Sequence, residues 1–293
     1  MREKISSGFR LLQDDICGQL EAEDGKGRFK EDLWERPGGG GGRTRILTGG
    51  DVIEKGGVNF SEVHGSLSPA IQKALELPAP DFFATGVSIV MHPNSPHVPI
   101  IHMNVRYFEA GDRWWFGGGI DLTPHYVVRD QARYFHQQLR ATCLNHNEIF
   151  YPRFKQWADD YFYIAHRKET RGIGGIFFDR LGPETATCEA LHSFVADVGK
   201  TFAPTYRHLM SINRHRTHTE HERQWQLLRR GRYVEFNLVY DKGTRFGLET
   251  DGRIESILMS LPALAAWEYD FRPETNSREE ETLNLLRKGL DWG

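Results

Sequence analysis

Three polar side chains alternate with apolar ones in PIIHMNVRYF, residues 99–108. His102, Asn104 and Arg106 would share one face of an extended chain, because successive side chains of a strand point to opposite sides. An imidazole exchanges protons near neutral pH, and a guanidinium binds a carboxylate through paired hydrogen bonds. The row therefore indicates a site that combines a proton donor, a neutral hydrogen-bonding group and a fixed cation, with His102 as candidate general acid or base.

Three further predicted strands would widen this polar face. A single strand with one polar side only indicates a solvated surface, but several such strands together favour a site. Glycines within a strand often leave space for a ligand or for another backbone. The shared face would carry Ser88 and His92 from 83–92, Trp115, Gly117, Gly119 and Asp121 from 113–121, and Glu235, Asn237 and Asp241 from 232–241.

Histidines also raise the possibility of a metal site. His92 and His102 could ligate a metal across two paired strands, whereas His136 and His166 fall on predicted helices. A single histidine on a helix is more often a satisfied core or edge residue than a ligand. No HExxH motif is present, so the metal signal is weak and an acid–base role for His102 needs fewer assumptions.

The strand and helix patterns come in blocks and do not alternate strictly. This order predicts one α+β domain over residues 1–293, with a single large, roughly seven-stranded antiparallel sheet flanked by helices on both faces. The predicted strands are 58–64, 83–92, 98–109, 113–121, 174–179, 232–241 and 245–250. The predicted helices are 5–22, 68–77, 130–145, 152–170, 185–200, 202–228 and 277–290.

Residues 37–50 form the one low-complexity segment, with five consecutive glycines followed closely by Arg43 and Arg45. Such a segment is either a flexible linker or a mobile anion-binding flap, and the two arginines favour the flap. It lacks the GK[ST] ending of a Walker loop. Arg229 and Arg230 are equally compatible with a ligand site and with a loop of solvated charges.

Composition narrows the class of protein. The chain has 293 residues, a net charge of −3 and 26% charged residues, which gives no reason to expect nucleic acid or an anionic membrane as partner. The three cysteines include no CxxC pair, so we do not expect a disulfide framework. We expect instead that the protein works in a reducing compartment. There is no apolar run long enough for a membrane span and no visible targeting segment, so we predict a cytoplasmic location.

Several long motifs resemble one family over about residues 8–292. They are SIVMHP, VPIIHMNVRYF, WWFGGGIDLTP, YPRFKQWADDYFYIAHRKETRGIGGIFFD and RRGRYVEFNLVYDKGTRFGLETDGRIESILMSLP, and they are similar to motifs of oxygen-dependent coproporphyrinogen III oxidases. The resemblance implies a haem-biosynthesis enzyme that converts two propionates of coproporphyrinogen III to vinyl groups and gives protoporphyrinogen IX. It also implies O2 as electron acceptor, no organic cofactor, and a homodimer formed through residues 233–268.

The same resemblance implies roles for particular residues. His102 would be the proton donor, and Asp121 would contact the pyrrole nitrogens as base or counter-charge. A divalent metal on His92, His102, His136 and His166 remains an alternative to a metal-free mechanism. Asp251 departs from the small residue expected there, and its charge would repel a propionate unless it turns away. The implied substrate contacts are Ser88, Asn104, Val105, Arg106, Asp251, Gly252 and Arg253.

Three other functions compete with this interpretation. A histidine-based metalloenzyme predicts tightly bound metal and loss of activity with a chelator. A non-enzymatic tetrapyrrole carrier predicts tight binding without turnover, and the presence of an acid–base set, His102 with Asp121, argues against it. A purely structural dimer module is the least attractive, because the predicted sheet face is rich in arginine and opened by glycine.

Overall fold

The central element is an antiparallel sheet of seven strands in the order β1-β2-β3-β4-β5-β6-β9. The computed structural model describes residues 1–69, 72–73, 76–249 and 252–293. A small hairpin of β7 (Tyr163–Ile164) and β8 (Glu169–Thr170) stands apart from the sheet. The sheet strands are β1 (Lys30–Glu35), β2 (Gly40–Thr48), β3 (Ile53–Ser66), β4 (Asp81–Pro93), β5 (Ile100–Ala110), β6 (Arg113–Thr123) and β9 (Gly175–Leu181).

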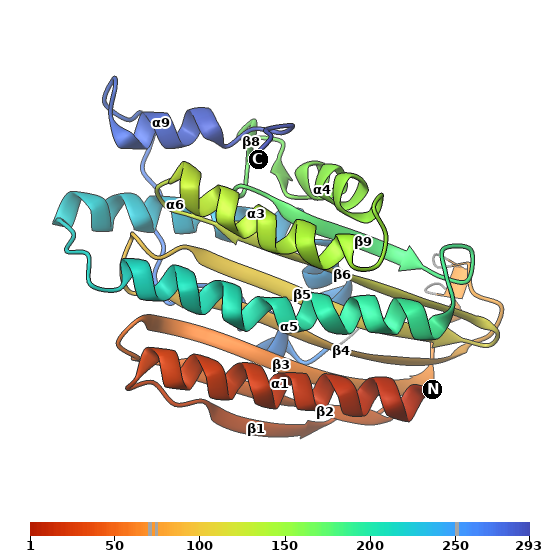
Figure 1. Ribbon diagram of the computed structural model, residues 1–293. Helices are drawn as coiled ribbons and strands as arrows, with labels where there is room; N and C mark the ends of the chain where they lie inside the picture. The colour runs from red at the N-terminus through yellow and green to blue at the C-terminus, as the bar shows by residue number, and fades with distance from the viewer. Residues whose placement is uncertain (70–71, 74–75, 250–251) are drawn as a thin grey trace.

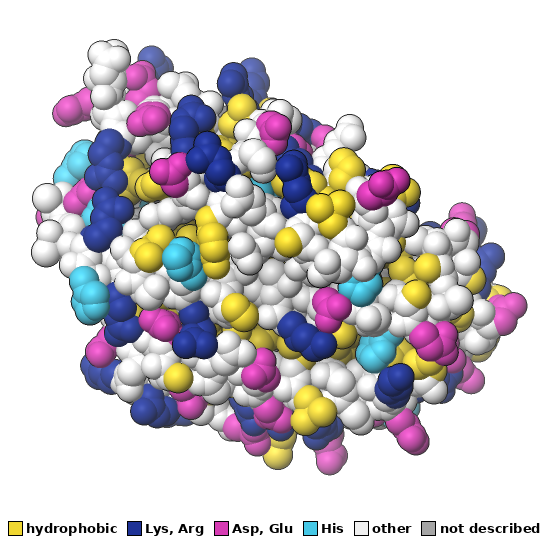
Figure 2. All heavy atoms as spheres, viewed as in Figure 1, with side chains coloured by type: hydrophobic (Ala, Val, Ile, Leu, Met, Phe, Trp, Pro, Cys, Tyr) yellow, Lys and Arg dark blue, Asp and Glu magenta, His cyan; other side chains and the backbone are white. Residues whose placement is uncertain are grey.

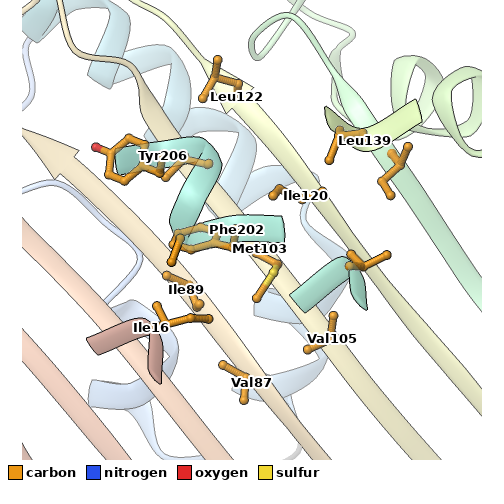
Figure 3. Close-up of a cluster of buried hydrophobic side chains, with 14 of the residues drawn as sticks. Ile16, Val87, Ile89, Met103, Val105, Ile120, Leu122, Leu139, Phe202 and Tyr206 are labelled. Atoms are coloured by element: carbon orange, nitrogen blue, oxygen red, sulfur yellow. The ribbon is translucent and has the colours of Figure 1, made fainter. Parts of the chain in front are cut away.

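One face of the sheet is covered by four helices, α1 (Arg2–Asp24), α3 (Arg129–Leu144), α4 (Phe150–Tyr161) and α5 (Cys188–Asn213), which lie in front of it in Figure 1. Helix α1 packs on β3 and β4, and α5 packs on β5 and β6. Apolar side chains at alternate strand positions point into this layer, and Figure 3 shows Met103, Val105 and Ile120 among them. Burying each such side chain contributes about 1.5–3 kcal/mol, so this layer is the main core.

The opposite face of β4, β5 and β6 carries the half-buried Ser88, Asn104 and Arg106 together with Gly117 and Gly119, and we call it the open face. Helices α6 (Glu220–Val239), α7 (Lys242–Glu249) and α8 (Ile254–Leu258) follow in the chain, and blue segments that precede α9 lie behind the sheet in Figure 1. They cover one end of the open face.

We call α6 and the residues that follow it, up to Leu261, the cover. Specific contacts attach the cover to the sheet. The hydroxyls of Thr44 and Ser256 are 2.7 Å apart, and Lys55 donates to the carbonyl oxygen of Leu261 at 2.7 Å. A final helix, α9 (Arg278–Leu285), packs near Tyr126, whose hydroxyl bonds Glu279. The cover therefore divides the open face into a buried end and an exposed end.

The predicted α+β class and seven-stranded antiparallel sheet are confirmed, but two of the predicted strands were wrong. Residues 232–239 lie in α6 and residues 245–249 lie in α7, whereas residue 250 is outside the described residues. A capping box at Thr219 and Glu222 begins α6, and Tyr233, Phe236 and Asn237 form its buried stripe, so an apparent alternation was part of a helical repeat.

Residues 37–50 were predicted as a flexible loop, whereas most of this segment is strand β2. A side chain at Gly42 would collide with the Trp34 ring of β1, so glycine there permits close strand packing. Arg43 pairs with Asp14 at 2.7 Å, and Arg45 pairs with Glu31 at 2.8 Å. The arginines therefore attach the edge strands to each other and to α1, and the flap and linker interpretations are both wrong.

Other boundaries also moved. The helix predicted over 152–170 ends at Tyr161, and the β7–β8 hairpin follows, with His166 in its turn. The helices predicted at 185–200 and 202–228 are rearranged into α5, which runs to Asn213, and α6. The helix predicted at 68–77 includes positions outside the described residues.

Of the described helices, none is long and apolar enough to cross a membrane. Charged side chains of both signs are spread over the helix-covered face (Figure 2).

Candidate active site

Asp121 and His102 are cross-strand partners at the covered end of the open face, in β6 and β5. The His102 Nδ1 atom lies 2.7 Å from Asp121 Oδ1. An ionised carboxylate can only accept hydrogen bonds, so Nδ1 carries a proton and donates it to Asp121. The carboxylate thereby fixes both the ring orientation and the tautomer of His102, which leaves Nε2 to exchange protons.

Arg171 lies directly behind this pair. Its Nη2 atom donates to Asp121 Oδ1 at 2.6 Å and to Oδ2 at 2.8 Å, and its Nη1 atom donates to Asn237 Oδ1 at 2.8 Å. The side chains of Arg171 and Asp121 are only 2% and 1% exposed. A buried ion pair with these hydrogen bonds keeps its charges compensated away from water.

Three aromatic rings surround the Arg171 guanidinium. Its central carbon lies 4.5 Å from the ring centroid of Phe162, 4.7 Å from Tyr233 and 4.6 Å from Phe236. Burial alone would raise the pKa of Asp121, but Arg171 and His102 more than offset this effect, and the pKa lies below its ordinary value. Asp121 therefore stays an anion under His102.

His102 presents the reactive edge of this cluster. Its side chain is 20% exposed, compared with 1% for Asp121, and its Nε2 atom has no hydrogen-bond partner among the described residues. The Phe162 ring packs edge-on against the imidazole, with the ring centroids 6.2 Å apart. A ligand on the open face would therefore meet the imidazole before the carboxylate. This geometry can move a proton to or from a ligand atom.

The exposed end of the open face carries a second arginine–aspartate pair. Arg106 Nη2 lies 2.9 Å from Asp179 Oδ1, and Arg106 Nη1 donates to Asn104 Oδ1 at 3.1 Å. A Cβ atom on Gly117 would come within 2.7 Å of Asp179 Oδ1 and 2.8 Å of Arg106 Nε. The missing side chain of Gly117 thus makes room for this ion pair. Ser88 is the register partner of Asn104 and extends the polar row onto β4.

The other predicted substrate contacts lie in different surroundings. The Val105 side chain is fully buried in the core on the helix-covered face. It therefore points away from the open face, and only backbone atoms of Val105 remain for a contact there. Arg253 pairs with Asp32 of β1, and its guanidinium lies 5.9 Å from the Trp34 ring centroid. The backbone N–H of Gly252 donates to Gly247 at 2.9 Å. Asp251 is outside the described residues.

The four histidines predicted as a possible metal set have separate partners. His92 is buried, and its Nε2 atom is 2.8 Å from the carbonyl oxygen of Ser260. Both ring nitrogens of His136 are engaged, by the Tyr151 hydroxyl and the Ile173 carbonyl, each at 3.0 Å. His166 lies between Tyr240 and Glu235, at 2.7 Å from each.

Within the described parts of the chain, no group of three or more His, Cys, Asp or Glu residues could hold a metal ion. Burial lowers the pKa of His92 to about 3 and that of His136 to about 4, so both rings are neutral at pH 7. His92 donates its Nε2 proton to Ser260, so its lone pair lies on Nδ1, which has no partner among the described residues. The lone pair of His136 lies on Nδ1 and accepts from the Tyr151 hydroxyl, because Nε2 donates to Ile173. The residues present therefore do not fit a four-histidine metal site in this arrangement.

Two residues of the open face and its cluster, Arg171 and Asp179, were not predicted as site residues. Arg171 was visible only as an arginine beside the glycines of RGIGG, and Asp179 follows the apolar run 176–178 within β9. Glu235 and Asn237 were expected on one strand face, but in α6 they diverge. Asn237 bonds Arg171, whereas Glu235 pairs with Arg167 at 2.6 Å. The RGIGG segment was the available signal, because glycine often marks close backbone approach.

Together, these observations define an α+β fold whose sheet carries a hydrogen-bonded histidine–aspartate pair and arginine side chains on one face. A family model described as Coproporphyrinogen III oxidase matches residues 4–292. The chain therefore belongs to the coproporphyrinogen III oxidase family, and the family predicted from the sequence is confirmed.

Curated relatives agree with this assignment. An oxygen-dependent coproporphyrinogen-III oxidase of Drosophila melanogaster is 50% identical over 310 residues, which cover 100% of this chain and 78% of the relative. Proteins of the same name from Prochlorococcus marinus (strain NATL2A) and Synechococcus sp. (strain CC9902) are 47% and 46% identical. Their alignments cover 96% and 99% of this chain, and 88% and 87% of the relatives.

Proposed function

We propose that this chain catalyses the oxygen-dependent conversion of two propionate groups of coproporphyrinogen III to vinyl groups, which gives protoporphyrinogen IX for haem biosynthesis. Each propionate carboxylate reacts with O2 and a proton to give a vinyl group, CO2 and H2O2. The C–H bond at the carbon next to the pyrrole and the C–CO2 bond break, and a C=C bond forms. O2 accepts the two electrons, and no organic cofactor enters this balance.

The observation that carries the proposal is the His102–Asp121–Arg171 cluster at the covered end of the open face. The reaction consumes a proton for each carboxylate, and the Nε2 atom of His102 can supply it to reduced oxygen or exchange one with a pyrrole nitrogen. Asp121 is buried beneath the imidazole and is bonded by both His102 and Arg171. Its role is therefore to orient and charge-balance His102, so contact with the substrate falls to the histidine.

We assign substrate binding to the exposed end of the open face. The substrate carries four carboxylates on apolar rings, and Arg106 and Arg253 offer guanidinium groups that bind carboxylates through paired hydrogen bonds. Ser88 and Asn104 offer neutral hydrogen-bonding groups between them. Gly252 and the backbone of Val105 contribute main-chain groups only, and a role for Asp251 stays a prediction.

Turnover by chelator-treated, metal-analysed protein tests this function. We expect oxygen-dependent formation of protoporphyrin, measured by fluorescence after oxidation of the product, at the full rate without added metal. Activity that appears only after a divalent ion is added would instead support the histidine metal site. Tight tetrapyrrole binding without product under either condition would favour the carrier.

Histidine variants separate the same alternatives. His102→Gln should lower kcat by roughly 10²- to 10⁴-fold, as expected for loss of a general acid or base, with little change in binding of the substrate. His166→Gln is the matched control and should retain activity. An equal loss in both variants would contradict the acid–base role and favour a shared metal.

Residues 233–268 are proposed to form a homodimer interface. Several large apolar side chains in this segment are exposed, at 51% for Val239, 58% for Ile254, 58% for Leu264 and 55% for Trp267. Large apolar side chains that remain exposed in one segment are expected where a partner covers that segment. Ile254→Glu combined with Leu264→Glu should convert the dimer to a monomer in sedimentation velocity, whereas Leu11→Glu, at a 68% exposed position of α1, should not. We keep the cytoplasm as the predicted compartment.

A further inference from the structure

A bulge in β9 changes which side chains reach the open face. Gly118 pairs with Phe178 and Phe116 pairs with Leu181, so Asp179 and Arg180 together oppose Gly117 alone. A bulge of this kind places two residues opposite one and redirects their side chains. Arg180 has φ 49°, a left-handed conformation that is strained for a non-glycine residue.

As a result, the side chains of two consecutive residues of β9 lie on the same face of the sheet. Successive residues of a regular strand point to opposite faces, so Arg180 would otherwise lie behind the sheet from Asp179. Instead, Asp179 bonds Arg106, and the Arg180 guanidinium carbon lies 5.7 Å from the ring centroid of Trp115. Trp115 is the β6 partner of Phe108 on the open face.

The two arginines at this end differ in their partners. Asp179 already compensates Arg106 at 2.9 Å. Arg180 is exposed and makes no hydrogen bond or ion pair with any of the described residues. The bulge therefore places one uncompensated cation next in sequence to the aspartate of the ion pair.

An aromatic surface adjoins this cation. The rings of Trp115 and Phe108 stack at 4.4 Å with an interplanar angle of 23°, and those of Phe108 and Phe82 stack at 5.9 Å and 9°. These rings extend across β6, β5 and β4. Flat apolar rings beside a free guanidinium are complementary to a pyrrole ring that carries a propionate.

We propose that Arg180 binds a propionate on the side of the substrate away from the reacting group, with its pyrrole ring against Trp115 and Phe108. Trp115 is six residues from Asp121, about 20 Å along the strand, so this contact is remote from the acid–base pair. Arg180 is thus a positioning and specificity residue. The inference rests on the proposed function, since it assigns a contact to the same substrate.

Kinetics of the full-length protein with coproporphyrinogen III provide the test. Arg180→Gln should raise KM about tenfold with kcat within about twofold, because a charge-assisted contact to the ground state and the transition state is lost equally. Arg180→Lys should keep part of the effect. The matched control is Arg153→Gln, which removes an exposed arginine 5.9 Å from the Phe154 ring in α4.

Two further measurements exclude a structural cause. Arg180→Gly removes the same side chain and relieves the positive φ, so its Tm should equal or exceed that of the wild type while KM rises as in Arg180→Gln. Fluorescence quenching should show about tenfold weaker binding of coproporphyrin III, a tetracarboxylate, to Arg180→Gln, with unchanged binding of its methyl ester.

The outcomes separate the two proposals. No turnover by the wild type would defeat the proposed function whatever Arg180 does. Turnover by the wild type with an unchanged KM in Arg180→Gln would overturn the inference alone. Equal weakening of the charged and esterified porphyrins would also overturn it, because the carboxylate would then not be the group recognised.

Discussion

Two arginine–aspartate pairs lie on the same face of the sheet and differ chiefly in their burial. In the pair Arg171–Asp121 the side chains are 2% and 1% exposed, whereas in Arg106–Asp179 they are 38% and 34% exposed. Both pairs have short N–O distances, 2.6 and 2.9 Å. The difference between them is the cover that α6 and the residues after it place over one end of the face.

Burial decides what each pair can do. Neither member of the covered pair can be released without leaving an uncompensated charge, so Asp121 remains an anion and His102 keeps one orientation. The exposed pair is partly hydrated, and a ligand carboxylate can replace Asp179 as the partner of Arg106 at little cost. The same pair of residue types therefore gives a fixed group at the end where we propose catalysis and an exchangeable one at the end where we propose binding.

The largest expected effect comes from breaking the covered pair. Arg171→Gln should lower the free energy of unfolding by about 3–5 kcal/mol, because it leaves the Asp121 charge buried and unpaired. Arg106→Gln removes the same group from the exposed pair and should cost less than about 1 kcal/mol. Urea denaturation measures both values.

A double variant separates this charge effect from simple loss of packing. Arg171→Met with Asp121→Asn removes both charges and should be more stable than Arg171→Gln, although inactive. If Arg171→Gln and Arg106→Gln proved equally mild, the contrast between the two ends would be wrong.

A smaller effect concerns pH at the covered end. Burial lowers the pKa of His92 to about 3, helped by the positive charges of Arg230, Lys55 and Arg171, while the ordinary value is 6.5. The unfolded chain therefore binds this proton more readily, and the free energy of unfolding falls as pH decreases below 6.5. The loss is about 1.4 kcal/mol per pH unit from this group.

Urea denaturation between pH 7.5 and 5.5 checks this prediction. His92→Gln should flatten the dependence on pH by that amount, whereas His215→Gln, at an exposed position, should leave it unchanged. A wild-type slope in His92→Gln would mean that His92 is not held neutral by the covered end.

The smallest effects sharpen the contrast at the exposed end. Asp179→Asn removes the competitor for Arg106 and should lower KM by a few-fold, with a change in stability below about 1 kcal/mol. Arg106→Gln should raise KM while leaving kcat nearly unchanged. Both effects should weaken at high salt, because exposed charges are screened. An unchanged KM in both variants would mean that the ion pair does not open for the ligand.

Residues 99–121 show how much of the site could be predicted. Strict alternation in two successive strands joined by a short turn fixed which side chains share a face. The pairing of His102 with Asp121 follows from that register. The same reasoning failed at 232–241, because Tyr233, Phe236 and Asn237 satisfy a helical repeat equally well and only the cap at Thr219 marks the helix.

The glycine-rich segment 37–50 failed for a different reason. A run of glycines carries no side-chain pattern, so neither strand nor loop can be distinguished locally. Strand β2 forms because β1 and β3 supply backbone partners on both sides and because Gly42 accommodates the Trp34 ring. Such long-range pairing leaves no periodic signal in the segment itself.

The sequence by itself determined the family, the α+β class and the polar row that contains His102, Asn104 and Arg106, since these depend on motifs and local periodicity. Only the tertiary structure decided that Arg171 lies under Asp121, that the four histidines have separate partners and that Arg180 reaches the open face. Each of these depends on burial or on the register between segments far apart in the chain. Charge pairing and burial are properties of that three-dimensional arrangement, and residue spacing alone does not encode them.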